Sequence, residues 1–158
     1  MQVAIAVGSN LHDRHRTMQS AARSLAQLDG VRVLHTSQVE ETEAIGPPQP
    51  RYLNQMVLVE TTLALPILLA QLQAIEEKHG RTRIEPKGAR TLDLDIVWAD
   101  APVCCSAELL VPHPGLNDRD FWQRELAELL GPDSAARAIA AAQVHAGLDT
   151  SHQASVAS

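Results

Sequence analysis

The strongest constraint on the fold is the segment R-T-L-D-L-D-I at residues 90–96, in which apolar and acidic residues alternate. A period of two predicts a β-strand, because successive side chains of a strand point to opposite faces. Asp93 and Asp95 then lie together on one face, with Cα atoms roughly 6–7 Å apart, and the apolar residues are buried on the other. Such a pair suits two Mg²⁺ ions, although the pattern also fits an ordinary half-buried strand with a solvated face.

Positive charge is concentrated just before this strand, in a chain whose net charge is −6. Four of the 13 Lys and Arg residues lie there: Arg81, Arg83, Lys87 and Arg90. Metal ions bridge phosphoryl oxygens and guanidinium groups neutralise the remaining charge, so this neighbourhood suits a polyphosphate. A merely solvated face would not need the grouping, and we therefore favour a phosphate-binding site.

Length and charge limit the function classes. The 158 residues, 45% of them hydrophobic, predict one globular domain. A pI of 5.6 argues against nucleic-acid binding, and the basic cluster is local, so we expect small-molecule partners. We also expect a monomer. Cys104 and Cys105 are adjacent and cannot form an ordinary disulfide, which indicates the cytoplasm. No apolar segment is long enough to span a membrane, so no membrane partner is expected.

The hydrophobic pattern predicts an α+β fold, a ferredoxin-like sandwich. Its mostly antiparallel sheet should have helices packed on one face and loops forming the site on the other. The expected strands cover residues 2–7, 31–36, 53–62, 90–96 and a short return strand at 103–105, and the helices cover 13–28, 65–79 and 118–130. Residues 1–131 are expected to form a single catalytic domain, and 132–158 an Ala-rich weak helix with a disordered tail.

Two local assignments accompany this fold. Gly8-Ser9-Asn10 lacks the Gly-Lys-Ser/Thr signature of a phosphate loop, so Gly8 is expected to serve a turn at the end of the first strand. Trp122 lies on the apolar stripe of helix 118–130, which predicts a core position.

Several motifs follow one another along residues 7–130. They are Gly8-Ser9-Asn10, Gly46-Pro47, Tyr52-Leu53-Asn54, Gln73 with Glu76, Gly80-Arg81-Thr82-Arg83, the R-T-L-D-L-D-I strand, and Val111-Pro112-His113 with Arg119 and Phe121. In this order they resemble the 6-hydroxymethyl-7,8-dihydropterin pyrophosphokinases of folate biosynthesis. The resemblance implies transfer of a pyrophosphoryl group from ATP to the pterin hydroxymethyl oxygen, with release of AMP and no covalent intermediate.

Site residues are implied at the positions that match this family. Asp93 and Asp95 would hold two Mg²⁺ ions, and Arg81 and Arg90 would join them as catalytic residues. The implied ATP contacts are Gln73, Glu76, Arg83, Arg90, Ile96, His113 and Arg119. The implied pterin contacts are Thr42, the backbone near Ile45, Tyr52, Asn54, Asp93 and Phe121.

Composition gives an independent argument for the pterin side. The chain has one Tyr and one Phe, and both fall where the family sandwiches the pterin ring. Two aromatic faces suit a flat heterocycle, but Phe121 could instead anchor its helix and Tyr52 could be a strand-edge residue. His113 could donate to a phosphate or satisfy a loop carbonyl, and Asn54 could read the pterin edge or end a strand. Gln73 and Glu76, three residues apart, also fit an exposed polar helix face.

Four positions depart from the family pattern: Lys87 replaces a tryptophan, Glu43-Ala44 replaces a proline pair, and Pro114 replaces an aromatic residue. They predict altered loop closure rather than loss of the site. Two alternatives stay open at this point. One is a paralogue with another pterin-like acceptor, and the other is a non-catalytic ferredoxin-like module that binds a nucleotide or a small metabolite.

Overall fold

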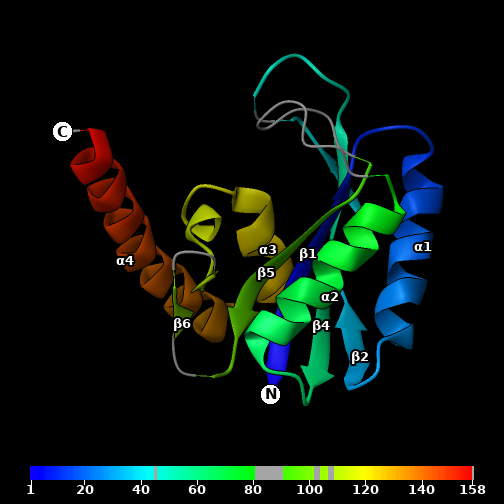
Figure 1. Ribbon diagram of the computed structural model, residues 1–158, viewed down its shortest axis with the longest axis horizontal. Coiled ribbons are helices and arrows are strands. Elements are labelled where there is room, and N and C mark those ends of the chain that lie inside the picture. The colour runs from blue at the N-terminus through cyan, green and yellow to red at the C-terminus, as the bar shows by residue number, and fades with distance from the viewer. Residues whose placement is uncertain (45, 81–90, 102–103, 107–108, 158) are drawn as a thin grey trace.

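The computed structural model describes residues 1–44, 46–80, 91–101, 104–106 and 109–157. Figure 1 shows an open sheet with helices on either side of it. In chain order the elements are β1 (Gln2–Ser9), α1 (Arg14–Gln27), β2 (Val31–Thr36), β3 (Glu40–Thr42), β4 (Tyr52–Thr61), α2 (Leu65–Lys78), β5 (Asp93–Ala99), β6 (Cys104–Cys105), β7 (Leu110–Val111), the 3₁₀ helix η1 (Pro114–Asn117), α3 (Asp120–Leu130) and α4 (Pro132–Ala157).

The main sheet has the strand order β2-β4-β1-β5, and β3 pairs with β4. Every pair in it is antiparallel, with β1 and β4 at the centre and β5 at one edge. This arrangement confirms the α+β class and the ferredoxin-like sandwich. It also brings β1, β4 and β5 side by side, and these three strands carry the acidic pair and the Tyr52-Leu53-Asn54 motif.

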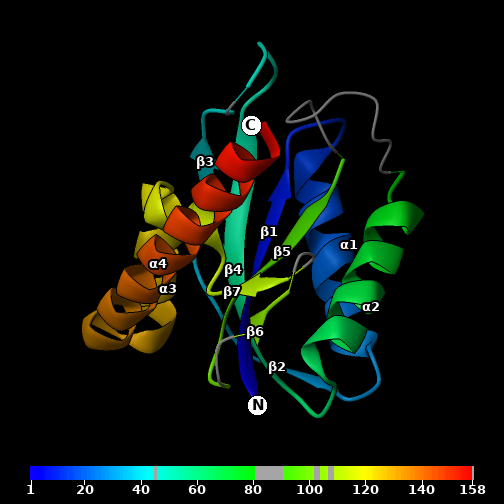
Figure 2. The ribbon, with the colours of Figure 1, turned by 60° about the vertical axis from the view of Figure 1, so that its left-hand side comes forward.

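The helices cover both faces of the sheet, so the expectation that they pack on one face is wrong. Figure 2 shows the sheet between α1 and α2 on one side and α3 and α4 on the other. Ala4 and Ala6 of β1 lie on the second face, where small side chains let Trp122 and Leu126 of α3 approach the strand. Periodicity defines the buried side of a helix, but it does not say which sheet face that side meets.

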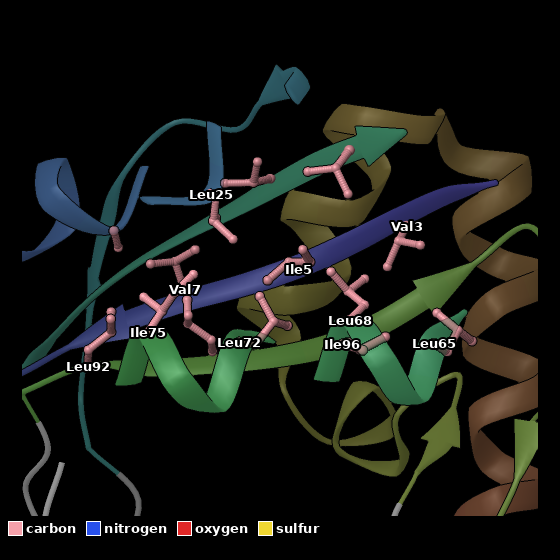
Figure 3. Packing of buried hydrophobic residues seen from close by; sticks show 14 of the residues in the cluster. Val3, Ile5, Val7, Leu25, Leu65, Leu68, Leu72, Ile75, Leu92 and Ile96 are labelled. Atoms are coloured by element: carbon pink, nitrogen blue, oxygen red, sulfur yellow. The ribbon is translucent and has the colours of Figure 1, made fainter. Parts of the chain in front are cut away.

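The face under α1 and α2 is packed with large aliphatic side chains (Figure 3). Val3 and Ile5 of β1 are fully buried there, against Leu68 and Leu72 of α2 and Leu25 of α1. Burying one such side chain stabilises the fold by about 1.5–3 kcal/mol. This face therefore contributes substantially to stability, and it holds β1 and β5 in place on the side of the sheet opposite α3.

The first two helices begin and end where the sequence places them, within two residues. Asp13 caps α1, since its Oδ1 accepts a hydrogen bond of 3.2 Å from the backbone N–H of Arg16. A proline occupies the first turn of α2, where its missing N–H is not needed. Gly80 follows α2 with φ +77°, a left-handed conformation that glycine adopts without strain.

Two C-terminal features differ from expectation. The predicted return strand is present at Cys104–Cys105, but it pairs with Leu110–Val111 in a separate two-stranded sheet and not with β5. Helix α4 extends to Ala157, into the segment for which composition favours disorder. The domain boundary at residue 131 stays a prediction. Among the described helices, none combines the length and the apolar character needed to cross a bilayer.

Candidate active site

A pocket of about 250 Å³ opens on the sheet face that also carries α3. Its walls come from β1, β4 and β5, from the segment after β3, and from the start of α3. Eight residues predicted from the sequence line it: Thr42, Tyr52, Asn54, Asp93, Asp95, His113, Arg119 and Phe121. Segments that are far apart in the chain therefore meet in one site.

Gly8 forms part of the floor of this pocket. It lies inside β1, opposite Asn54 of β4 on one side and Asp93 of β5 on the other. The prediction that Gly8 serves a turn is therefore wrong. A Cβ atom at Gly8 would lie 3.3 Å from Asn54 Oδ1 and 3.4 Å from Tyr52 Cδ1, so the missing side chain leaves room beside the Asn54 amide and the Tyr52 ring.

The acidic strand has the predicted alternation. Leu94 and Ile96 are buried against α2, whereas Asp93 and Asp95 are half-exposed and line the pocket. This confirms that the two carboxylates share one face of β5. It also places Ile96, an implied ATP contact, in the core on the opposite face of the sheet.

The carboxylate pair fits a magnesium site of the kind that is completed by a substrate. Mg²⁺ prefers oxygen ligands and is usually held by one or two carboxylates together with waters and substrate phosphates. Within the described residues, no group of three His, Cys, Asp or Glu side chains is arranged to hold a metal ion by itself. Asp93 and Asp95, both open to the pocket, can supply the protein's share of the ligands.

His113 is oriented by the 3₁₀ helix that follows it. Its Nδ1 accepts a hydrogen bond of 2.9 Å from the backbone N–H of Gly115. An accepting Nδ1 carries no proton, so the neutral ring carries its proton on Nε2. Nε2 lies 4.0 Å from Asp95 Oδ1, and this ring edge can therefore donate beside the acidic pair.

Arg119 and His113 meet at Trp122. The Arg119 guanidinium carbon lies 4.3 Å from the centre of the Trp122 ring, and the His113 ring approaches the same ring edge-on at 5.1 Å. Such cation–π and T-shaped contacts fix side chains that would otherwise be mobile. Gly115 leaves the space for this, since a Cβ there would lie 2.9 Å from Arg119 Nη1 and 3.0 Å from His113 Nδ1.

Trp122 is a site residue that the sequence interpretation missed. It is buried with the apolar stripe of α3, as predicted, but it also lines the pocket. Its neighbour Phe121 packs partly against the same core and lines the pocket as well, with the two rings 6.3 Å apart. The sequence signal that could have identified Trp122 was its position next to Phe121, since the chain has few aromatic residues.

The opposite wall is formed by β3 and β4. Asn54 is buried, and its Nδ2 donates a hydrogen bond to Thr42 Oγ1. The amide oxygen then lies on the Gly8 side of the pocket, next to the half-buried ring of Tyr52. Glu43, which departs from the family pattern, also lines the pocket, and its carboxylate lies 3.5 Å from the Arg51 guanidinium.

Other predicted residues lie elsewhere. Gln73 is exposed on α2, away from the pocket. Glu76 is buried, and its Oε2 accepts a hydrogen bond of 2.9 Å from the backbone N–H of Leu94, between the two aspartates. It thereby ties α2 to the edge strand. Four predicted positions, Ile45, Arg81, Arg83 and Arg90, lie outside the described residues.

A second buried carboxyl group, besides that of Glu76, lies on α3. Glu125 follows Phe121 by one turn of α3, is 2% exposed, and neither carboxyl oxygen has a hydrogen-bond partner within 3.5 Å among the described residues. Burial raises the pKa of Glu125 to about 9, and the neighbouring Glu40 carboxylate adds to the shift. Glu125 is therefore neutral at pH 7.

Paired carboxylates beside a histidine, an arginine and aromatic side chains, on one face of an α+β sandwich, are typical of a group-transfer enzyme that handles phosphates. Residues 4–131 match the model of the 7,8-dihydro-6-hydroxymethylpterin-pyrophosphokinase (HPPK) family. The chain belongs to this family, as the motifs indicated, and the family's reaction is pyrophosphoryl transfer from ATP to hydroxymethyldihydropterin in folate biosynthesis.

Curated relatives support the assignment. The chain is 39% identical over 129 residues to the 2-amino-4-hydroxy-6-hydroxymethyldihydropteridine pyrophosphokinase of Synechocystis, a match that covers 82% of this chain and 66% of that protein. It is 37% identical over 133 residues to the protein of the same name from Pseudomonas aeruginosa, covering 84% and 82%. The folic acid synthesis protein fol1 of Schizosaccharomyces pombe is 38% identical over 130 residues, which are 82% of this chain but 18% of that protein.

Proposed function

We propose that this chain transfers the pyrophosphoryl group of ATP to the hydroxymethyl oxygen of 6-hydroxymethyl-7,8-dihydropterin, giving AMP and the pterin diphosphate. The observation that carries the proposal is the arrangement around Gly8. Asn54 lies on one side of this residue and Asp93 on the other, so a ring-binding end and an acidic end share one pocket. That is the layout needed to bring a pterin alcohol to a nucleotide phosphate.

The pterin end is assigned to β3, β4 and α3. Tyr52 and Phe121 offer aromatic faces for the pterin ring, and Asn54 offers an amide whose orientation Thr42 fixes. An amide with a fixed orientation presents its N–H and its oxygen at set positions, so it selects a ring edge whose acceptor and donor match those positions. The backbone near Ile45 is assigned to the same end from the family pattern.

The phosphate end is assigned to β5 and to the segment from His113 to Arg119. Asp93 and Asp95 would hold two Mg²⁺ ions, which when bound draw negative charge off the phosphoryl oxygens. His113 Nε2–H and the Arg119 guanidinium would donate to phosphate oxygens, and both are already oriented by Gly115 and Trp122.

The remaining assignments come from the family pattern. Arg81 and Arg90 are assigned to catalysis together with the aspartates, and Arg83 and Arg90 to ATP binding. Gln73, Glu76 and Ile96 are assigned to the nucleotide as well, on the α2 side of β5. A cytoplasmic location and a monomeric state belong to the same proposal.

These residues act mainly by positioning and by electrostatic stabilisation. Phosphoryl transfer needs little covalent chemistry from the protein, since the attacking hydroxyl and the leaving group need only be aligned and their charge stabilised. The pocket supplies rigid walls for both tasks, because its floor is a sheet and its donors are held by hydrogen bonds and ring contacts.

The test is a product assay with the full chain, ATP, Mg²⁺ and the dihydropterin alcohol. AMP and pterin diphosphate should form in equal amounts, and a chelator should stop both. A matched control is 6-methyl-7,8-dihydropterin, which keeps the ring but lacks the attacking hydroxyl, and should bind without yielding AMP. Binding of ATP with no AMP in the complete mixture would instead identify a non-catalytic module, and a second productive pterin-like acceptor would identify a paralogue.

A further inference from the structure

Helix α4 lies beyond residues 4–131, which the family model matches, yet it packs against the site. It contacts α3 and the 3₁₀ helix η1, and Figure 2 shows it beside α3. Ala135, Ala138 and Ala142, at helical spacing, are buried in the same core as Trp122. Small side chains on this face bring the α4 backbone close to the segment that leads into η1.

His145 extends this buried face by one further turn. It is 3% exposed, and its Nδ1 lies 2.7 Å from the backbone oxygen of Pro112. A carbonyl oxygen only accepts, so His145 Nδ1 must carry the proton. The contact joins residues 33 apart in sequence and supplies a buried loop carbonyl with its donor.

The carbonyl that His145 holds belongs to the residue before His113. The backbone N–H of His113 donates a hydrogen bond of 2.8 Å to the Val97 oxygen on β5. Its Nδ1 accepts from Gly115, which lies in η1. The peptide unit between Pro112 and His113 is thus held by α4 at its oxygen and by β5 at its nitrogen, and these two hydrogen bonds set the direction in which the His113 ring leaves the backbone.

We propose that His145 is a positioning residue for the phosphate end of the site, acting through the Pro112 carbonyl to hold His113 Nε2 beside Asp95. The inference rests on the proposed role of His113 as a phosphate donor. It gives α4 a part in the reaction although the helix lies outside the matched family segment and contributes no described residue to the pocket wall.

The experiment compares two substitutions at His145. In His145→Asn the side-chain amide nitrogen stands where Nδ1 stands, and it can keep the bond to Pro112; in His145→Leu the space is filled but the donor is lost. The matched control is Val144→Ala, one residue earlier on the exposed side of α4. Each variant is characterised by its melting temperature, by kcat and KM for ATP, and by equilibrium affinity for the dihydropterin.

We expect His145→Leu to lower kcat/KM for ATP about tenfold at temperatures where it is fully folded, because a misaligned donor loses about one charge-assisted hydrogen bond. The pterin affinity should stay within about twofold, since Tyr52, Asn54 and Phe121 do not depend on this contact. His145→Asn should recover most of the loss, and Val144→Ala should match wild type. If His145→Leu does not fold, His145→Gln, whose donor reaches one bond farther, should show the same loss.

A double-mutant cycle with His113→Ala separates positioning from general packing. If His145 acts through His113, His145→Leu should have little further effect on kcat/KM for ATP once His113 is removed. Equal losses in both backgrounds, or equal losses of ATP and pterin parameters, would overturn the inference. If His113→Ala lowered kcat/KM for ATP and His145→Leu did not, the inference would also be overturned. If His113→Ala left kcat/KM for ATP unchanged, the proposed role of His113 itself would be refuted.

Discussion

The two faces of the sheet differ in the side chains that a single strand presents to them. Along β1, Val3, Ile5 and Val7 face α1 and α2, whereas Ala4, Ala6 and Gly8 face α3 and the pocket. Large aliphatic side chains are packed on the first face (Figure 3). Small ones on the second face let a helix approach at one end and leave a pocket at the other. The pocket thus lies on the side of β1 that carries the small side chains, and the larger aliphatic core lies on the other side.

The largest effect should come from removing a carboxylate on the pocket face. We expect Asp95→Ala to lower AMP formation about a thousandfold or more, because the metal ligand and its charge are lost where phosphoryl charge moves. Its melting temperature should stay near that of wild type, since Asp95 is half-exposed. The exposed Asp29→Ala is the control, and near-normal turnover in Asp95→Ala would rule out the metal assignment.

The next effect should come from the other face and should appear in stability. Leu72→Ala removes a fully buried side chain between α2 and the sheet, which should cost about 3 kcal/mol in the free energy of unfolding. Urea unfolding measures this cost. Turnover per folded molecule should fall less than about threefold, and a loss of activity comparable to that of Asp95→Ala would show that the faces are not separable.

A smaller effect should come from Glu125, the buried carboxyl group of α3, and should appear in the pH dependence of stability. Burial raises the pKa of Glu125 from 4.5, the ordinary value of a glutamate in an unfolded chain, to about 9, so the folded protein binds the extra proton. Its contribution to stability is present below pH 4.5 and is lost progressively as the pH rises toward 9. Glu125→Gln removes this pH dependence. The free energy of unfolding of the variant, relative to that of wild type, should therefore rise by about 2 kcal/mol or more between about pH 5 and pH 8. Urea unfolding at several pH values measures this difference. If the free energies of unfolding of wild type and variant changed in parallel with pH, Glu125 would not be a buried neutral acid.

The smallest effect should come from filling the floor of the pocket. In Gly8→Ala the new Cβ would approach Asn54 Oδ1 at 3.3 Å and the Tyr52 ring at 3.4 Å, so the pterin affinity should fall about tenfold. Stability should be unchanged or up to about 1 kcal/mol higher, because glycine is unfavourable inside a strand. Gly147→Ala, whose Cβ would meet no atom within 4 Å, is the control in equilibrium binding of the dihydropterin.

Sequence reasoning succeeded where the signal was local. The alternation of residues 90–96, the start of a helix at Asp13 and the proline at the start of α2 each fix a short segment by its own chemistry, and the structure has the strand and both helices. The acidic pair and the two ring-binding candidates also converge on one pocket. That convergence came from matching ordered motifs, since spacing along the chain does not say which strands are neighbours.

It failed where the answer depends on what packs across the sheet. Gly8 looked like a turn residue because glycine ends many strands, but its role follows from facing Asn54 and Asp93 on adjacent strands. Trp122 fitted the apolar stripe of α3, and only the position of that helix on the second face brings its ring to the pocket. The pairing of β6 with β7 likewise depends on tertiary structure, because the sequence of a two-residue strand does not identify its partner.

The bond between Glu76 and the Leu94 N–H has a consequence for self-association. β5 is an edge strand, and an unpaired backbone donor on such a strand is a place where another chain can add to the sheet. The Glu76 carboxylate occupies the donor that lies between the two aspartates. The residue that fastens α2 to this edge therefore also keeps the Leu94 N–H from pairing with a strand of another chain.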